Sequence, residues 1–121
     1  MRKSDKKLEK AIVAALTEAC EDALKIYEGF EWLTHVVNYQ TFPESFTIVC
    51  VFDNQESLLL AYGEAKGESL KAAIESKLLT HNIKIKGIKK RILFDTEEAC
   101  TLESGGNWKK RLEGIHLARH V

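Results

Sequence analysis

The 121-residue chain has few of the residues that rigidify or cross-link a fold, with one proline and three cysteines. Cys20, Cys50 and Cys100 are odd in number and far apart, which excludes a complete disulfide framework and a C-x-x-C redox or zinc element, so we expect free thiols. No apolar run approaches the roughly 20 residues of a transmembrane helix. The charged start, MRKSDKKLEK, also lacks the apolar core of a signal peptide. These absences predict a cytoplasmic protein without a membrane partner.

The chain also lacks net charge and the short motifs of common catalytic sites. Its 18 Lys and Arg residues balance 18 Asp and Glu residues, whereas a dedicated nucleic-acid-binding domain is usually strongly basic. It contains no G-x-G-x-x-G, P-loop or G-x-S-x-G sequence. No nucleophile, base and orienting group can be assembled from it. We therefore expect a binding module without a cofactor rather than an enzyme.

The residues that are present predict one folded α+β domain. A hydrophobic fraction of 45% is enough for a core, and 121 residues suit a single domain. Apolar residues recur every three or four positions from Leu8 to Tyr27 and again within residues 68–81, which predicts two helices. Gly29 and Asn82 stand where such helices commonly end.

Three further segments have the composition of β-strands. Residues 32–39 and 46–52 are rich in β-branched and aromatic side chains, and a polar stretch containing Pro43 separates them, so they predict a hairpin. Residues 83–95 change to a two-residue alternation, which predicts a third strand.

A glycine-containing connection, Gly63–Gly67, predicts a break between two helices, because each glycine inside a helix costs about 1 kcal/mol relative to alanine. The first of these helices is predicted to be capped by Asp53 and to run to Tyr62. The order helix, strand, strand, helix, helix, strand is that of a type II KH domain, in which a G-x-x-G loop between two helices grips a nucleic-acid backbone. Here the loop is one residue longer and carries Glu64, so the chain resembles KH topology without its binding signature.

The simplest architecture is a two-layer domain, residues 1–95, with helices on one face of a three-stranded sheet. Residues 96–121 read as an acidic loop and a C-terminal tail or short helix packed on that domain. Apolar residues are left over for the opposite sheet face. We expect that face to be covered either by the C-terminal segment or by a second copy of the chain.

The leading functional hypothesis is a self-associating or protein-binding module that uses this opposite face. Its predicted interface consists of Val49, Val51, Leu93 and Trp108. The alternative is a nucleic-acid-binding or transcription-associated protein that uses a basic strand edge.

The alternative depends on charge that is segregated along the chain. Residues 1–10 have five basic and two acidic side chains, and residues 11–83 have four basic and eleven acidic ones. Residues 84–91 have five basic side chains and no acid, namely Lys84, Lys86, Lys89, Lys90 and Arg91. Such a run either contacts phosphates or protects an exposed strand from edge-to-edge pairing. Because no aromatic residues are interleaved with it, we favour edge protection.

The histidines and the acidic run offer little chemistry. His35 lies inside a predicted strand, where a hydrogen-bonded structural role is expected. His116 and His120 are four residues apart but have no third protein ligand nearby for zinc. The acidic residues within 95–98 lack the glycine turns of a hard-cation loop. We therefore predict no metal site.

Several segments resemble a small, uncharacterised family of proteobacterial proteins. They are DKKL (5–8), GFEWLTHVVNY (29–39), FP (42–43), VCVFD (49–53), FDTEEAC (94–100) and GNW (106–108). Members often carry the label "Fis family transcriptional regulator". The resemblance implies a cytoplasmic bacterial protein and transfers no functional residues. A Fis-type protein reads DNA with a C-terminal helix-turn-helix, whereas residues 95–121 predict one short helix at most.

Overall fold

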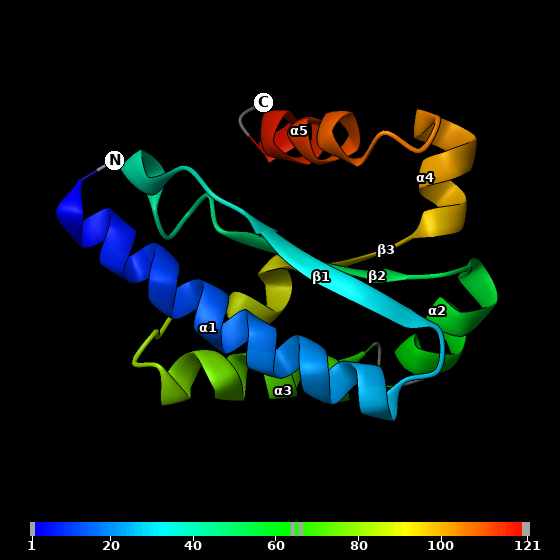
Figure 1. Cartoon of the computed structure of the whole chain (residues 1–121), viewed down its shortest axis with the longest axis horizontal. Helices are drawn as coiled ribbons and strands as arrows, with labels where there is room; N and C mark the ends of the chain where they lie inside the picture. Colours follow the sequence, from blue (N-terminus) through cyan, green and yellow to red (C-terminus); the bar gives the residue numbers. More distant parts are fainter. Residues whose placement is uncertain (1, 64, 66, 120–121) are drawn as a thin grey trace.

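A three-stranded sheet separates two groups of helices in the computed structural model, which describes residues 2–63, 65 and 67–119. The elements in chain order are α1 (Lys3–Ile26), β1 (Phe30–Val36), η1 (Tyr39–Thr41), β2 (Thr47–Phe52), α2 (Gln55–Tyr62), α3 (Glu68–Thr80), η2 (Ile88–Arg91), β3 (Ile92–Thr96), α4 (Glu97–Ser104) and α5 (Trp108–Arg119). Helices α1 and α3 lie on one side of the sheet and α5 on the other (Figure 1). The predicted α+β fold and its element order are confirmed. Within the described residues, no helix is long and apolar enough to cross a membrane.

The strand order is β1-β2-β3, with β1 antiparallel and β3 parallel to the central strand β2. The predicted hairpin is therefore confirmed, and α2 and α3 supply the crossover that a parallel pair requires. Cys50 in β2 stands opposite Leu33 in β1 and Phe94 in β3. In the described part of the chain, each outer strand has one edge with no neighbouring strand.

The main core lies between this sheet and the helix pair α1 and α3. Alternate residues of β2 face the helices and are almost fully buried, namely Phe46 just before it and Ile48, Cys50 and Phe52 within it. Helix α1 contributes residues at helical spacing, namely Ile12, Ala15, Leu16, Ala19 and Ala23. At the surface, the Lys77 ammonium in α3 lies 3.6 Å from Glu18 and 3.4 Å from Asp22 in α1.

The third strand is shorter than predicted. Alternation across residues 83–95 predicted one strand, but β3 begins only at Ile92. Gly87 has a φ of +70°, and the chain turns there into the 3-10 helix η2. Ile85 and Ile88, on either side of this turn, are both buried. The isoleucines of this segment reach the core because the chain turns, so they do not mark one face of a strand.

The beginning of α2 also differs from the prediction by one residue. Its cap is Asn54, whose side-chain oxygen accepts a hydrogen bond from the backbone N–H of Ser57 at 2.9 Å. The Asp53 carboxylate instead accepts from the backbone N–H of Asn54 at 2.7 Å. The predicted break after this helix is confirmed, because α2 ends at Tyr62 and α3 begins at Glu68.

The acidic segment after β3 is helical, so the prediction of a loop there is wrong. Thr96 caps α4 by accepting a hydrogen bond from the backbone N–H of Ala99 at 2.9 Å. Gly105 ends the helix with a φ of +59°, and α5 follows three residues later. The expectation of a single C-terminal helix is therefore also wrong.

Candidate nucleic-acid interface

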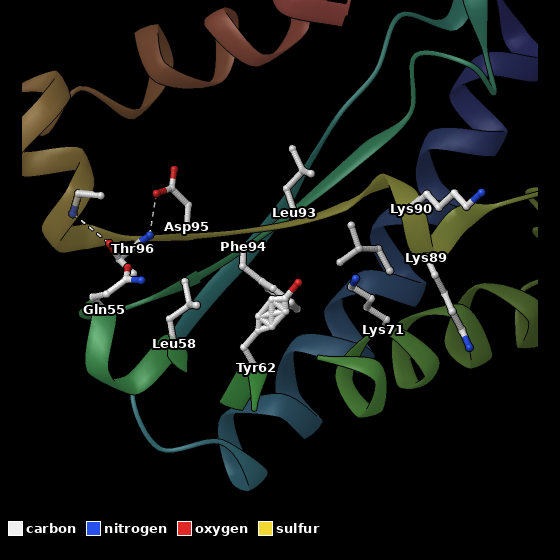
Figure 2. Close-up of a pocket in the computed structure, with 12 residues that line it drawn as sticks. Gln55, Leu58, Tyr62, Lys71, Lys89, Lys90, Leu93, Phe94, Asp95 and Thr96 are labelled. Carbon is white, nitrogen blue, oxygen red and sulfur yellow. Dashed lines mark hydrogen bonds between the residues drawn. The ribbon is translucent and has the colours of Figure 1, made fainter. Parts of the chain in front are cut away.

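A groove of about 460 Å³ runs along β3 on the side that has no neighbouring strand (Figure 2). It is bordered by α2, α3, η2 and β3, and the first turn of α4 reaches one end. Its lining combines aromatic, apolar and cationic side chains, among them Tyr62, Lys71, Lys89, Lys90, Leu93 and Phe94. The outer backbone edge of β3 is open to a ligand in this groove.

The connection Gly63–Gly67 brings two aromatic rings together here. Gly67 has a φ of +73°, which favours glycine, and a Cβ built on it would come within 2.4 Å of the Phe94 ring. Gly67, at the end of the connection, therefore lies directly on that ring. The Tyr62 ring, at the end of α2, meets Phe94 at 5.3 Å between centroids and an interplanar angle of 63°. Figure 2 shows the Phe94 side chain pointing towards Tyr62, whereas Leu93 and Asp95 point to the opposite side of β3.

Lys71 in α3 places a cation beside both rings. Its Nζ lies 6.0 Å from the Tyr62 ring centroid and 5.8 Å from that of Phe94, within the range of a cation–π contact. All three side chains are partly exposed. The groove therefore offers a positive charge and accessible aromatic surface at the same point.

Two further lysines stand near the start of β3. Lys89 is half-buried and donates a hydrogen bond to Glu68, which raises the pKa of Lys89, and Lys90 is exposed. The nearby Asp95 carboxylate is held by Arg111, with Nε to Oδ2 at 2.7 Å and Nη2 to Oδ1 at 3.0 Å. Arg111 therefore compensates the Asp95 carboxylate, as Glu68 compensates Lys89, and Lys71 and Lys90 remain as cations of the groove.

The five basic residues predicted as one stripe are divided among three places. Lys89 and Lys90 line the groove. Lys84 and Lys86 instead line a separate hollow beside the end of α3. Arg91 donates a hydrogen bond to the backbone carbonyl of Glu44, in the connection between β1 and β2. The turn at Gly87 separates Lys84 and Lys86 from the three basic residues that follow it.

Sequence reasoning missed the two aromatic residues and Lys71. Tyr62 and Lys71 lie well before residues 84–91 and Phe94 lies just after them, so none of the three is interleaved with the basic run. The Gly63–Gly67 break was the sequence feature that could have predicted this grouping. A sharp turn between two helices brings the end of the first helix, with Tyr62, close to the start of the second helix, with Lys71.

The predicted interface on the opposite sheet face is not a free surface. Val49 and Val51 are each 0% exposed, Trp108 is half-buried, and only Leu93, at 37%, is exposed. Of the two expected covers, the C-terminal segment lies on this side of the sheet (Figure 1). A surface containing Val49 and Val51 is therefore unavailable to a partner in this structure.

A carboxylate shared by two tryptophans holds the C-terminal helices in place. Glu97 in α4 accepts hydrogen bonds from Trp32 Nε1 at 2.7 Å and Trp108 Nε1 at 3.2 Å. The two indole rings meet edge to face, with centroids 4.8 Å apart and an interplanar angle of 80°. The cluster links β1, α4 and α5, and it satisfies both indole N–H groups.

Helices α4 and α5 are consecutive, yet they do not present the surface of a helix-turn-helix reader. In such a motif the first residues of the second helix face the base edges. Here Trp108 packs on Trp32 and Arg111 is paired with Asp95, which leaves Lys109 and Lys110 as exposed bases in that turn. The groove beside β3 combines its lysines with partly exposed aromatic rings, so it is the better candidate for a nucleic-acid interface.

The histidines mainly join α1 to its neighbours. His35 Nε2 lies 2.9 Å from Glu9 Oε1, which confirms the predicted hydrogen-bonded histidine. His81, at the end of α3, has its Nε2 atom 2.7 Å from Glu18 Oε2. The side chain of His116 and the whole of His120 are outside the described residues.

Burial determines the exposure of the cysteine thiols and raises the pKa of two of them. Cys50 and Cys100 are 0% exposed, and Cys20 is half-buried. Burial raises the pKa of Cys50 to about 12 and also raises that of Cys100. The three cysteines are free thiols, as predicted. Among the residues that the structure describes, no group of three or more His, Cys, Asp or Glu side chains could hold a metal ion.

Comparison of the chain with protein-family models, curated proteins and solved structures finds no match. The resemblance to the Fis-labelled family thus rests on the sequence segments alone. Function has to be argued from the groove and its chemistry.

Proposed function

We propose that this chain binds single-stranded nucleic acid in the groove beside β3. The observation that carries the proposal is the position of Lys71 over the partly exposed rings of Tyr62 and Phe94. Proteins that bind single strands combine cations that follow the phosphates with aromatic rings on which bases stack. The groove offers both kinds of group along an open strand edge.

The shape of the groove favours a single strand over a duplex. The two rings lie between a helix and a strand edge, so only an unstacked base can reach them. The open backbone groups of β3 can donate to and accept from the edges of such a base. Tyr62, the residue before the Gly63–Gly67 connection, lines the same groove, and the connection follows the same element order as the backbone-gripping loop of KH domains.

The charge balance of the groove predicts modest affinity with a clear dependence on salt. Phosphates would compete with Glu68 for Lys89, while Lys71 and Lys90 remain as further phosphate contacts. For three lysines, single-strand counterion release predicts a slope of about −2 for the logarithm of affinity against the logarithm of salt concentration. A chain without net charge has little further attraction for a polyanion.

Fluorescence anisotropy tests the proposal with labelled mixed-sequence RNA and DNA strands of about 12 nucleotides, long enough for one such groove. Titrations at several salt concentrations give the affinity and its slope. We expect saturable binding of single strands, weaker binding of the matching duplex, and the salt slope given above. Absence of binding at low salt, or affinity independent of salt, would overturn the proposal.

Variants locate the binding surface. Lys71→Gln and Lys90→Gln should each weaken binding and reduce the salt slope by about 0.7, the value of one phosphate contact. Tyr62→Leu should weaken binding without changing the slope, because it removes a stacking surface and no charge. The matched control is Lys3→Gln, which removes the same charge from the exposed first turn of α1, outside the groove. Equal losses in the control and the groove variants would contradict the location.

A further inference from the structure

A second hollow lies beside the end of α3 and has a volume of about 510 Å³. Its buried lining is apolar, namely Leu78, Ile83, Ile85 and Ile88. Leu79, which also lines it, is 48% exposed. The exposed lysines Lys84 and Lys86 give it positive charge. Like the groove, this second hollow therefore combines accessible apolar surface with cations.

The groove and the second hollow lie along the same face of α3. Lys71 lines the groove, whereas Glu75 and Leu79 line the second hollow. These three residues follow one another at intervals of four, so they share one face of the helix. Lys71 and Leu79 are eight residues apart, which is about 12 Å along the helix axis. The second hollow therefore follows the groove along α3.

The 3-10 helix η2 joins the two depressions. Gly87 and Ile88 line the second hollow, and the next two residues, Lys89 and Lys90, line the groove. Figure 2 shows both of these lysines at the end of the groove opposite Thr96. The second hollow therefore begins one residue away from the place where the groove ends.

Lys89 stands at this boundary between two acids of α3. It donates a hydrogen bond to Glu68, and the charges of Glu68 and Glu75 also act on it, so its pKa is raised. Glu75 is half-buried and is the acid among the residues that line the second hollow. Because Lys89 compensates part of this acidic charge, Lys84 and Lys86 remain as cations of the second hollow.

We propose that a single strand bound in the groove continues across η2 into the second hollow, where Lys84 and Lys86 contact its phosphates. The inference rests on the proposed function, because the groove holds the first part of the strand. A single strand carries a phosphate at every nucleotide, so a protein that follows it needs cations at successive points of one path. The turn at Gly87 takes both lysines out of line with Lys90 and places them at the next point along α3.

The second hollow changes the expected dependence on salt. The slope of about −2 counts only the three lysines of the groove. Two further phosphate contacts, each contributing about 0.7, steepen it to about −3.5. The exposed side chain of Leu79 adds apolar surface for a base, which increases affinity without changing the slope.

Fluorescence anisotropy with strands of two lengths tests this path. A strand of about 5 nucleotides covers the groove alone, and a strand of about 12 nucleotides reaches the second hollow as well. We expect a slope of about −2 for the short strand and about −3.5 for the long one. The slope decides rather than the affinity, because a long strand also gains affinity from the number of registers in which it can bind.

Lysine variants separate the second hollow from the groove. Lys84→Gln and Lys86→Gln should each reduce the slope of the long strand by about 0.7 and leave that of the short strand unchanged. The matched control is Lys109→Gln, which removes the same charge from the exposed first turn of α5, on the other side of the sheet. It should change neither slope.

The outcomes distinguish this inference from the proposed function. A slope of about −2 for both strands would overturn the path and leave the proposed function standing. A long-strand slope that neither Lys84→Gln nor Lys86→Gln changes would do the same. Absence of binding by both strands would overturn both proposals. An equal loss in Lys109→Gln would show that the second hollow does not hold the phosphates.

Discussion

The ring of Phe94 in β3 lies directly on Gly67, the last residue before α3, so that a Cβ at position 67 would come within 2.4 Å of Phe94 Cε2. The contact joins the helix-to-helix connection to the edge strand and fixes the shape of the groove between them. Both the positive φ of Gly67 and the space it leaves are therefore needed at this point.

Gly67→Ala should destabilise the protein more than Gly87→Ala does. Both glycines have a similar positive φ, +73° and +70°, but nothing lies within 4 Å of a Cβ at position 87. Gly87→Ala, the control, should lower the free energy of unfolding by about 1 kcal/mol because of the backbone conformation. Gly67→Ala should lower it by about 1–3 kcal/mol more, because the Phe94 ring has to be displaced. Urea unfolding monitored by circular dichroism gives both values, and equal costs would show that Phe94 yields freely.

Glu97→Gln should loosen the C-terminal helices. The carboxylate accepts an N–H from both Trp32 and Trp108, whereas an amide has one accepting oxygen and a donating nitrogen that would face the second indole. Leaving one part-buried N–H unsatisfied should cost about 1–3 kcal/mol in unfolding free energy.

Tryptophan fluorescence provides the second measurement for this variant. The emission of Glu97→Gln should shift to the red as water reaches the indoles. Glu113→Gln, on the exposed side of α5, is the control and should leave both emission and stability unchanged. An unchanged spectrum in Glu97→Gln would refute the shared-acceptor account.

The stability of the protein should depend on pH through the Glu18 carboxyl group. The hydrogen bond from His81 is the main cause that lowers the pKa of this carboxyl below its ordinary value of 4.5. A depressed folded-state pKa contributes stability above the unfolded value, and that contribution is lost as pH falls through the folded value. Wild type should therefore exceed Glu18→Gln in stability at about pH 6, and the difference should disappear as the pH falls below 4.5 and through the folded-state pKa.

Urea unfolding of the two proteins across this pH range measures the convergence. Glu21→Gln, an exposed carboxylate on the same helix, is the control for a general effect of removing one charge from α1. A stability difference that stayed constant with pH would rule out a contribution from the His81 contact.

Only Cys20 should react quickly with a thiol reagent in the native protein. Burial removes Cys50 and Cys100 from solvent and raises the pKa of each, to about 12 for Cys50, so their reactive thiolates are scarce near neutral pH. Titration with Ellman's reagent at about pH 8 should show one fast thiol, and full reactivity only after unfolding. Cys20→Ser should lose the fast phase, and its persistence would locate the reactive thiol elsewhere.

Local patterns in the sequence were enough for most of the secondary structure. The helical spacing in α1 and α3, the β-branched runs of β1 and β2, and the glycine break at 63–67 each depend on neighbouring residues, so they were predicted correctly. The segment 83–91 was not, because a left-handed Gly87 interrupts its alternation and tertiary burial places its isoleucines. The acidic helix α4 was missed because its cap, Thr96, was read as part of a loop.

By itself, the sequence determined an α+β domain with segregated charge, since periodicity and composition act over short distances. Only the tertiary structure decided which charges act together. It separated Arg91 from Lys90, although they are adjacent in the chain, and it joined Lys71 to Phe94 across 23 positions. It also showed that α5 lies on the side of the sheet whose apolar residues the sequence had left uncovered. These arrangements depend on how α2 and α3 cross over between the parallel strands β2 and β3. A pattern of neighbouring residues in the sequence does not contain that information.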